Sequence, residues 1–304
     1  MSQQDRQPTA GTAKKGAAGL GVLLALLATV VWSGSFVATR GMAGTVPPVQ
    51  AVFWRWIIAA LAVAPFAARQ AWQQRALIRR HLGYISLATL FGVTLYNTLV
   101  HQAGLTTSAS NMGTIMAASP VIMALYARMG GERLGARRVL GMLLAAFGVL
   151  LLVGHGSLSL HFGAGDLWMF AAALSFATYS ALLKRKPAEI GQLAFLLTTF
   201  VLGALMLAPA YAISLDVQGG FEATPATIGP LLYVGVFSSA VAFFAWNRAI
   251  SLIGAARAGV VYYLQPVCVA GLGLLLLGER TGPVQLLCTA LILAGVALGS
   301  AGRR

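Results

Sequence analysis

Apolar runs separated by short polar breaks recur along the whole chain. Each run has roughly 17 to 23 residues, the length that an α-helix needs to cross a lipid bilayer. Reading the runs between charge clusters or Gly/Pro breaks predicts ten helical spans. They are 20–39, 50–67, 82–100, 108–129, 137–153, 165–183, 190–211, 226–246, 254–277 and 283–300. The pattern predicts an all-α integral membrane protein.

The composition also predicts a lipid environment. Of the 304 residues, 58% are hydrophobic and only 9% are charged, whereas a soluble chain is about a quarter charged. The net charge of +14 comes from separate basic clusters between the spans, without the basic stripe that binds nucleic acid. Cys268 and Cys288 fall inside apolar runs, so neither a disulfide framework nor a metal site is predicted. The expected partner is the lipid bilayer, with no nucleic acid, cofactor or metal.

The basic residues predict the direction of the spans. Residues 1–19 are rich in Gln, Ala, Gly and Lys and are predicted to form a disordered cytoplasmic tail. With that end inside, 18 of the 21 Lys and Arg residues face the cytoplasm, while Arg40 and Arg280 lie outside and Arg55 lies within the second span. The positive-inside rule then predicts that both termini, including the short end 301–304, are cytoplasmic in a bacterial inner membrane.

An internal repeat relates the two halves of the chain. At a constant offset, small residues and a proline of the first half meet the same residue types in the second. The pairs are Ala103 and Ala249, Ala109 and Ala255, Gly113 and Gly259, Pro120 and Pro266, and Ala124 and Ala270. After one inserted residue, Gly-Glu-Arg at 131–133 meets Gly-Glu-Arg at 278–280. The two repeats are predicted to be 20–153 and 165–300.

Five spans per repeat is an odd number, so the second copy must cross the membrane in the opposite direction to the first. The uncharged outer loop 101–110 then corresponds to an inner loop that carries Arg248 and Arg257. Inverted repeats are typical of secondary transporters, which hold their substrate near the bilayer midplane at the repeat interface. The predicted fold is ten transmembrane helices, arranged as two inverted five-helix repeats around a central cavity.

The sequence resembles the drug/metabolite transporter superfamily, and within it the EamA-type ten-span transporters. The resemblance rests on Trp-Ser-Gly-Ser-Phe-Val-Ala at 32–38, on Phe-Trp-Arg-Trp at 53–56, and on the paired stretches 103–133 and 249–280. It covers the chain after the tail and is strongest to aromatic amino acid exporters of the YddG type. The resemblance implies a basket of ten helices that exports amino acids, aromatic ones included, by alternating access.

The resemblance leaves the cargo and the energy source open. The alternatives are proton-coupled export of drugs or metabolites and exchange of nucleotide sugars. A proton-coupled antiporter usually needs a buried carboxylate, whereas all seven acidic residues here fall in loops or at span ends. Facilitative transport of a small-molecule substrate is therefore predicted. A monomer is sufficient for it, and association into a homo-oligomer stays open.

An integral membrane enzyme is the alternative class of function. Lipid-modifying transferases and intramembrane hydrolases need an acidic Mg²⁺ cluster, a metal-binding His/Glu helix, or a nucleophile with its base. No DxxxD, HExxH or GxSxG pattern lies in any predicted span. The chain is therefore predicted not to be an enzyme, and it has no predicted catalytic residue.

Two ionisable residues are candidates for a role in transport. Arg55 lies about five residues into the second span and could attract a substrate carboxylate, because guanidinium binds carboxylate bidentately. The alternative is that its side chain reaches the nearby outer interface or ties helix ends together. His101, at the end of the third span, is a candidate proton carrier or part of the polar lining, and placement at the membrane interface is the alternative.

Recognition by aromatic and neutral polar side chains suits a zwitterionic or aromatic solute. The residues predicted to line the substrate site are Trp32, Ser33, Tyr96, Asn97, Asn111, Ser119, Tyr179, Trp246, Tyr262, Tyr263 and Gln265. Trp32, Tyr96, Tyr179 and Gln265 are expected to meet in one cavity. Asn111 and Ser119 are eight residues apart and are predicted to share a helix face. The structural alternatives are interfacial aromatic residues and hydroxyls that pack helices together.

Prolines and small residues predict how the helices pack. Pro120 and Pro266 fall within the fourth and ninth spans, where each removes a backbone hydrogen bond and is predicted to kink the helix. Symmetric kinks suit bending elements for alternating access, and purely structural kinks are the alternative. Small-residue faces in 137–153 and 283–300, at the predicted periphery, allow close helix contacts within the bundle or between copies of the chain.

Overall fold

The computed structural model describes residues 10–116, 118–129, 135–153, 163–262, 264–279 and 282–300, and every regular element in these ranges is helical. In chain order the elements are α1 (Ala10–Gly41), α2 (Pro48–Gln73), α3 (Arg75–Arg80), α4 (Leu82–Thr89), η1 (Leu90–Leu95), α5 (Tyr96–Gly104), α6 (Ala109–Met116), α7 (Ser119–Met129), α8 (Ala136–Val153), α9 (Ala164–Leu183), α10 (Gln192–Gln218), α11 (Pro225–Leu232), η2 (Tyr233–Val241), α12 (Ala242–Tyr262), α13 (Gln265–Leu277) and α14 (Pro283–Ser300).

Six helical segments in the described part of the chain are long and apolar enough to cross a membrane. They are Gly16–Gly41, Pro48–Gln73, Leu82–Gly104, Ala164–Leu183, Gln192–Gln218 and Pro225–Gly254. Gln265–Leu277 and Pro283–Gly295 are shorter apolar helices. The all-helical, membrane-spanning character predicted from the sequence is confirmed.

Several helices extend beyond the predicted spans. α1 begins at Ala10, so residues 10–19, which were expected in the disordered tail, continue the helix. Alanine is frequent in this stretch and is the strongest helix former. The 26 residues of α2 rise about 39 Å, more than the roughly 30 Å that a helix perpendicular to the membrane needs to cross the hydrocarbon core.

The fourth and ninth predicted spans are each divided into two helices. α6 and α7 are separate, and so are α12 and α13. Pro120 is the second residue of α7, and Pro266 is the second residue of α13. Proline is favoured in the first turn of a helix, where its missing N–H has no intrahelical acceptor and its φ is already helical. The predicted mid-helix kinks are therefore corrected to helix breaks that precede each proline.

A sharp bend at Gly254 joins the eighth and ninth predicted spans. Gly254 lies inside α12 with φ 78° and ψ 156°. Only glycine adopts such a positive φ without strain. The predicted loop between 226–246 and 254–277 is thus reduced to a kink at Gly254, which separates two helical segments of α12.

Two π-helical segments interrupt the third and eighth predicted spans at equivalent places. η1 lies between α4 and α5, and η2 lies between α11 and α12. Each carries main-chain carbonyls that accept side-chain donors: Phe91 of η1 accepts from the Ser175 hydroxyl at 2.7 Å, and Val234 of η2 accepts from the Ser239 hydroxyl at 2.8 Å. π turns are rare and occur frequently at functional sites.

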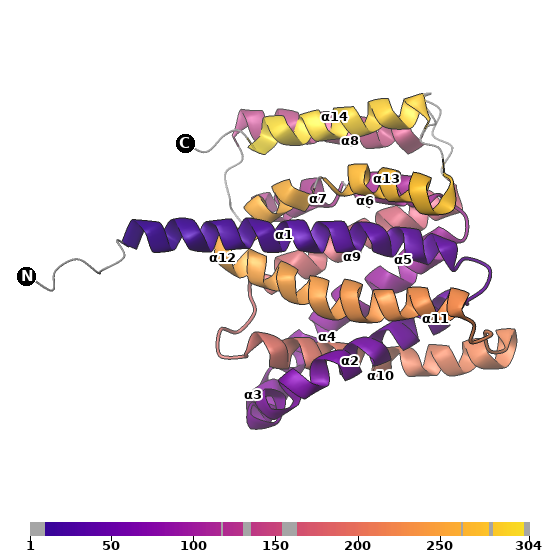
Figure 1. Ribbon diagram of the computed structural model, residues 1–304. Coiled ribbons are helices and arrows are strands. Elements are labelled where there is room, and N and C mark those ends of the chain that lie inside the picture. The colour runs from indigo at the N-terminus through magenta and orange to yellow at the C-terminus, as the bar shows by residue number, and fades with distance from the viewer. Residues whose placement is uncertain are drawn as a thin grey trace, which may run out of the picture.

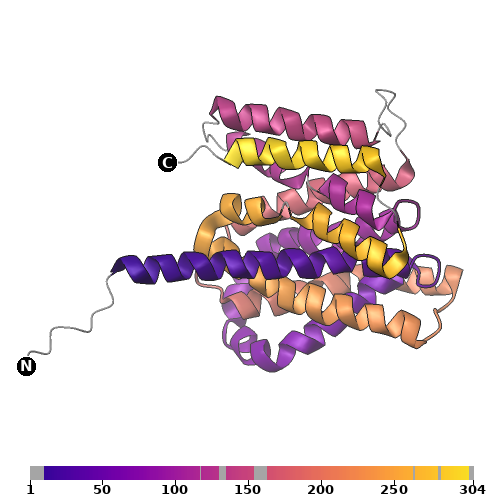
Figure 2. The ribbon, with the colours of Figure 1, turned by 45° about the horizontal axis from the view of Figure 1, so that its top comes forward.

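Both described ends of the chain lie at one end of the bundle, which we call the termini face (left in Figure 1). We call the opposite end the far face. α8 and α14 lie side by side along one edge of the bundle, and α2 packs on α10 along the other (Figures 1 and 2). A Cβ at Gly148 of α8 would lie 2.8 Å from the Ile292 side chain of α14. The small-residue helices pack closely at the periphery, as predicted.

α1 and α9 run in opposite directions through the bundle. Arg40 at the end of α1 donates a hydrogen bond of 2.8 Å to the Gly104 carbonyl. Thr107, three residues further on, donates at 3.1 Å to Asp166 in the first turn of α9. The end of α1 and the start of α9 therefore meet at the far face, as two elements of an inverted repeat would.

Candidate functional site

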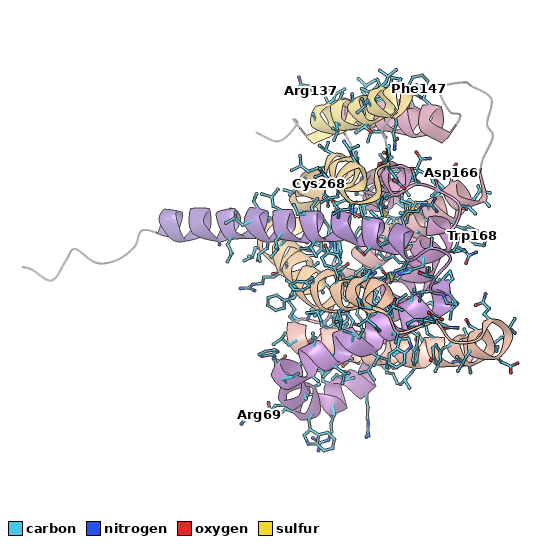
Figure 3. All side chains as sticks on the ribbon, turned by 45° about the vertical axis from the view of Figure 1, so that its right-hand side comes forward. Arg69, Arg137, Phe147, Asp166, Trp168 and Cys268 are labelled. Carbon is cyan, nitrogen blue, oxygen red and sulfur yellow. The ribbon has the colours of Figure 1, made fainter. Side chains whose placement is uncertain are left out.

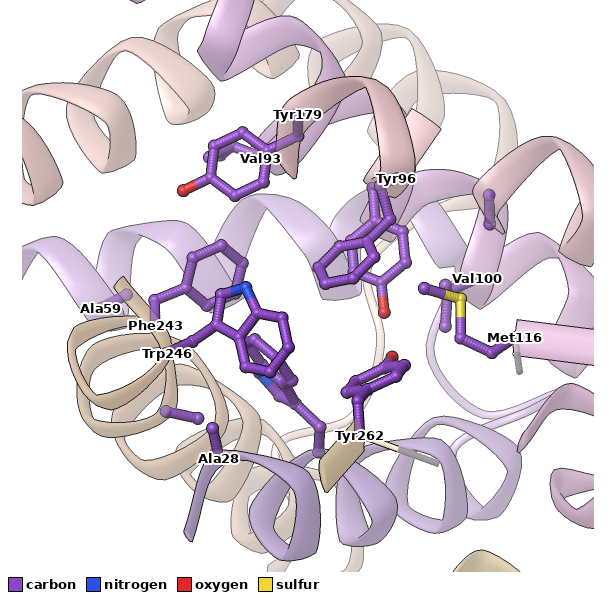
Figure 4. Packing of buried hydrophobic residues seen from close by; sticks show 14 of the residues in the cluster. Ala28, Ala59, Val93, Tyr96, Val100, Met116, Tyr179, Phe243, Trp246 and Tyr262 are labelled. Carbon is purple, nitrogen blue, oxygen red and sulfur yellow. The ribbon is translucent and has the colours of Figure 1, made fainter. Parts of the chain in front are cut away.

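Seven aromatic side chains meet in the centre of the bundle, and we call them the aromatic cage. They are Trp32, Tyr96, Phe176, Tyr179, Phe243, Trp246 and Tyr262. All seven are buried, and Figure 4 shows most of them turned toward a common centre. The Trp32 ring lies 5.3 Å from Trp246 and 5.4 Å from Phe243, between ring centroids. Trp32 meets Phe176, Phe243 and Tyr262 edge to face, a geometry that aromatic pairs favour.

The cage fills the place of the predicted central cavity. α1, α9 and α12 each contribute large rings, and α5 contributes Tyr96, whose centroid lies 5.2 Å from that of Phe176. Phe176 in turn stacks on Tyr262 at 5.6 Å. Because these rings interlock, the centre of the described bundle is packed rather than open. The predicted cavity is corrected to a packed aromatic centre in this structure.

Several polar atoms around the cage have no hydrogen-bond partner among the described residues. They are Nε1 of Trp246 and, by strict hydrogen-bond geometry, both side-chain polar atoms of Gln265 and the hydroxyl of Tyr262, which interacts only loosely with Gln265 and Tyr96. Gln265 is fully buried at the start of α13, and its main-chain carbonyl lies 3.4 Å from the Ser33 hydroxyl. A buried unpaired polar group costs about 1–3 kcal/mol. Such a cluster is expected at a site that receives a polar ligand.

Arg55 lies inside the bundle with no carboxylate partner in the described part of the chain. Its side chain is 2% exposed, and its guanidinium carbon lies 5.3 Å from the centre of the Trp56 ring. Serine hydroxyls accept its hydrogen bonds: Ser239 from Nε at 2.7 Å, Ser238 from Nη2 at 2.9 Å and Ser35 from Nη1 at 3.4 Å. A guanidinium has five N–H donors, so two remain for another acceptor. These contacts agree with the alternative in which Arg55 ties neighbouring helices together, here α1, α2 and η2.

η2 connects the guanidinium to the aromatic cage. The Ser238 hydroxyl accepts from Arg55, and the Ser238 carbonyl accepts from Trp32 Nε1 at 2.8 Å. The Ser239 hydroxyl, which also accepts from Arg55, donates to the Val234 carbonyl five residues earlier. One π-helical segment thus positions both the charged group and the central ring of the cage.

On the far face, one ion pair joins the ends of four helices. Arg40 Nε lies 3.6 Å from a carboxylate oxygen of Glu279, and Arg40 Nη1 donates to Gly104 at the end of α5. The same carboxylate accepts from the Ala109 N–H at the start of α6, at 3.1 Å. A carboxylate is favourable at a helix N-terminus because of the exposed N–H groups there. α1, α5, α6 and α13 are therefore tied together on this side of the cage.

On the termini face, a cavity of about 110 Å³ lies between α9, α10 and α12. Lys186 and Asn247 are among its lining residues, and Asn247 directly follows Trp246 of the cage. Partial burial lowers the pKa of Lys186, an effect that the nearby Glu189 charge opposes. The Lys186 ammonium donates to the Ile190 carbonyl. The cavity thus lies on the termini-face side of the cage. On the far face, the Arg40–Glu279 contacts hold the helix ends together.

The structure brings many of the predicted site residues together. Five belong to the aromatic cage: Trp32, Tyr96, Tyr179, Trp246 and Tyr262. Ser33 and Gln265 lie beside it, linked by the long contact between the Ser33 hydroxyl and the Gln265 carbonyl. Tyr263 lies outside the described residues. The backbone of η1 packs directly against the Tyr179 ring, because a Cβ added at Gly92 would overlap that ring.

Other predicted site residues bond locally and do not join the cage. Asn97 donates to the Val93 carbonyl at 3.1 Å. Asn111 donates to the Thr107 hydroxyl at 3.4 Å, near the far face. Ser119 donates to a main-chain carbonyl of its own turn at 2.7 Å. The shared helix face expected for Asn111 and Ser119 is wrong, because the helix is broken between them.

His101 is buried between helices of the bundle. Its side chain is 4% exposed. Nδ1 lies 2.9 Å from the Asn97 carbonyl, and Nε2 lies 3.5 Å from the Thr39 hydroxyl. The side chain of His101 is therefore held between α1 and α5, one turn from the end of α5.

Sequence reasoning missed three residues of the site. Phe176 and Phe243 belong to the cage, yet in the sequence they are ordinary apolar positions within apolar runs. Ser238 accepts hydrogen bonds from both Arg55 and Trp32. In the sequence, nothing distinguishes it from the adjacent Ser239. The wide π turn brings both serines toward one guanidinium, and hydropathy carries no signal for such a turn.

The sequence matches the EamA-like transporter family over residues 19–154 and 163–301. The chain belongs to the EamA-like transporter family. The resemblance to the drug/metabolite transporter superfamily is thereby confirmed. As an EamA-like protein with several apolar membrane-spanning helices, it is a multi-pass inner-membrane transporter.

Relatives of this EamA-like chain are similar over nearly their whole length. An uncharacterized transporter of Archaeoglobus fulgidus is 25% identical over 92% of this chain and 96% of the relative. A probable amino-acid metabolite efflux pump of Escherichia coli is 26% identical over 93% and 95%. A probable terminal-alkyne amino-acid exporter of Streptantibioticus cattleyicolor is 27% identical over 90% and 91%. These names support a membrane exporter and describe no enzyme.

The fold of this EamA-like transporter is similar to that of a solved structure titled "Crystal structure of protein". The TM-score is 0.66 at 19% identity, and the likeness covers 91% of this chain and 95% of the other. At this identity the likeness concerns the fold alone. It supports one continuous helical fold over the length of the chain.

Proposed function

We propose that this protein exports amino acids, aromatic ones included, across the bacterial inner membrane by alternating access. The observation that carries the proposal is Arg55, a buried guanidinium beside an aromatic cage, held by serines and without a carboxylate partner among the described residues. Charges inside a membrane protein are costly and usually mark a substrate pathway. Relatives named as amino-acid efflux proteins support this class of cargo.

The side chains of the site suit the carboxylate, the ammonium group and the side chain of an amino acid. The spare N–H donors of Arg55 suit a carboxylate, which guanidinium binds in bidentate geometry. The faces of Trp32 and Trp246 offer apolar contact to a side chain and a π surface to an ammonium group. Gln265 can donate to a carboxylate and accept from an amine. Binding would separate rings that are packed together in this structure.

The two faces of the bundle suggest how access alternates. The far face is tied by Arg40 and Glu279, and a cavity approaches the cage from the termini face. The internal repeat relates Glu279 to Glu132 and Arg40 to Lys184. We propose that these repeat partners close the termini face when the pair at the far face opens. The breaks before Pro120 and Pro266 would serve as the bending points.

The proposed topology has ten spans, as two inverted repeats with both termini in the cytoplasm. Reporter fusions ending after Gly220 and after Gly282 should therefore read as external, and a fusion ending after Pro187 should read as cytoplasmic. The physical reason is the retention of basic loops on the cytoplasmic side. A cytoplasmic reading at either external position would contradict the inverted arrangement.

Transport is proposed to be facilitative. The carboxylates of Asp166 and Glu279 lie at the far face and not in the cage, in contact with Thr107 and Arg40 respectively. Purified protein in liposomes should exchange radiolabelled tryptophan or alanine for internal amino acid at equal pH, and a protonophore should leave the initial rate unchanged. The solute should be recovered chemically intact.

Other outcomes of this counterflow assay identify the alternatives. Accumulation driven by a proton gradient would support a proton-coupled drug/metabolite exporter. Exchange of a nucleotide sugar, with no amino acid flux, would support a nucleotide-sugar exchanger. A chemically altered solute would support an enzyme.

Replacing Gln265 tests the polar anchor of the cage. Gln265→Leu should weaken the apparent affinity for amino acids about fivefold, because a net hydrogen bond contributes about 1 kcal/mol. The affinity is measured as the half-saturating concentration in counterflow at matched protein density. The control is Gln285→Leu in α14, a partly buried glutamine at the edge of the bundle. Equal half-saturating concentrations for the two variants would show that Gln265 does not contact the substrate.

A further inference from the structure

A groove of about 350 Å³ lies where α2, α3 and α10 meet. α3 is at the lower left of Figure 1, at the termini face, and Figure 3 labels Arg69 of α2 at the same corner. Ala68 and Ala71 of α2 and Leu197 of α10 contribute apolar surface to the groove. It therefore opens at the rim of the bundle, where lipid headgroups meet the protein.

Two guanidinium groups of α3 line this apolar groove. Arg75 and Arg79 are four residues apart and thus neighbours on one side of the helix. The Arg75 guanidinium lies 4.9 Å from the centre of the Trp72 ring, and its Nη1 donates to the Trp72 carbonyl at 3.0 Å. Among the described residues, neither arginine has a carboxylate within ion-pair distance. The groove combines an apolar surface with two uncompensated positive charges.

We propose that this groove binds an anionic phospholipid, with the phosphate on Arg75 and Arg79 and an acyl chain along Ala68, Ala71 and Leu197. Guanidinium groups bind phosphate in bidentate geometry. Basic pockets between membrane helices bind anionic headgroups. A free phosphate ion would occupy the charged part alone and leave the apolar part uncovered, whereas a phospholipid matches both.

The surroundings of the groove agree with a lipid occupant. Trp72 is 70% exposed, and exposed tryptophan is typical of the headgroup region. The groove also spans two helices that are already joined there. Gln70 Oε1 accepts from the Ala194 N–H at 3.1 Å, and Gln74 Oε1 accepts from the Gly191 N–H at 2.9 Å. A lipid in the groove would bridge α10 and α2, the helix that carries Arg55.

Native mass spectrometry of the purified full-length protein tests this site without any transport assay. The protein is titrated with phosphatidylglycerol and, separately, with phosphatidylcholine of the same acyl chains. We expect phosphatidylglycerol to bind more tightly, and Arg75→Gln/Arg79→Gln to weaken it roughly 30-fold, the effect of two charges near a membrane surface. Arg128→Gln/Arg137→Gln removes two exposed arginines elsewhere and should leave binding unchanged. Ala68→Trp should weaken both lipids by filling the groove.

Four outcomes would overturn the proposal. Equal binding of the two lipids would exclude selection by charge. An equal loss in the two double-arginine variants would indicate a general surface-charge effect. Displacement of phosphatidylglycerol by millimolar inorganic phosphate would indicate a phosphate site without an acyl-chain component. A protein dimer that forms through this face and excludes lipid would indicate a second copy as the occupant.

Discussion

Arg55→Gln is expected to weaken the apparent affinity for amino acids by roughly 10- to 100-fold, because a hydrogen bond to a charged group contributes about 1.5–3 kcal/mol. Glutamine can still donate to serines of η2, so the variant removes the charge without leaving an empty space. The measurement is the half-saturating concentration in counterflow, with expression and thermal stability in detergent matched to those of the unmodified protein.

A pair of ligands separates carboxylate recognition from a structural role of Arg55. Tryptamine lacks the carboxylate of tryptophan, so the unmodified protein should prefer tryptophan and Arg55→Gln should lose that preference. Arg55→Lys keeps the charge but lacks the guanidinium fork, so it should restore only part of the preference. Arg69→Gln, an exposed arginine on α2, is the matched control. An unchanged preference in Arg55→Gln would place the carboxylate elsewhere.

Trp32→Ala is expected to have the second large effect. Trp32 packs against four rings of the cage, with centroids 5.3 to 6.0 Å away, and its Nε1 donates to the Ser238 carbonyl. Loss of a buried tryptophan costs about 3–5 kcal/mol through the cavity that it leaves. We expect a lower melting temperature in detergent and a larger loss of affinity for tryptophan than for alanine.

Two further variants control for the general effect of removing a tryptophan. Trp168 is 42% exposed on α9 and is labelled at the edge of the bundle in Figure 3. Trp168→Ala should therefore leave both the melting temperature and the preference for aromatic cargo nearly unchanged. Trp32→Phe keeps a ring but loses the donor, so it should recover most of the stability. Equal losses for tryptophan and alanine in Trp32→Ala would argue against contact between this ring and the cargo.

Much of the helical framework could be predicted because apolar runs and small-residue patterns depend on local chemistry. α8 (Ala136–Val153) and α14 (Pro283–Ser300) coincide closely with predicted spans and lie at the predicted periphery. The prolines at equivalent places in the two repeats mark where the fourth and ninth predicted spans depart from a single continuous helix. A proline is compatible with either a kink or a new helix start, and only the surrounding packing decides between them.

The candidate site could be predicted only in part. Trp32, Tyr96 and Tyr179 were recognised because aromatic residues well inside a span are unusual in combination with neutral polar neighbours. Phe176 was missed because an apolar ring in an apolar run gives no contrast. Arg55 was recognised, but its three serine acceptors come from α1 and η2 and could not be paired with it from the sequence.

The sequence by itself determined that this chain lies in a membrane, because a composition so poor in charge cannot cover a soluble surface. The sequence also shows the internal repeat, because the same residue types recur at a constant offset between the two halves. Only the tertiary structure decided that the centre is packed, that the far face is tied by Arg40 and Glu279, and that η2 turns two serines toward Arg55. These features depend on contacts between residues far apart in the chain, and such contacts leave no periodic pattern in it.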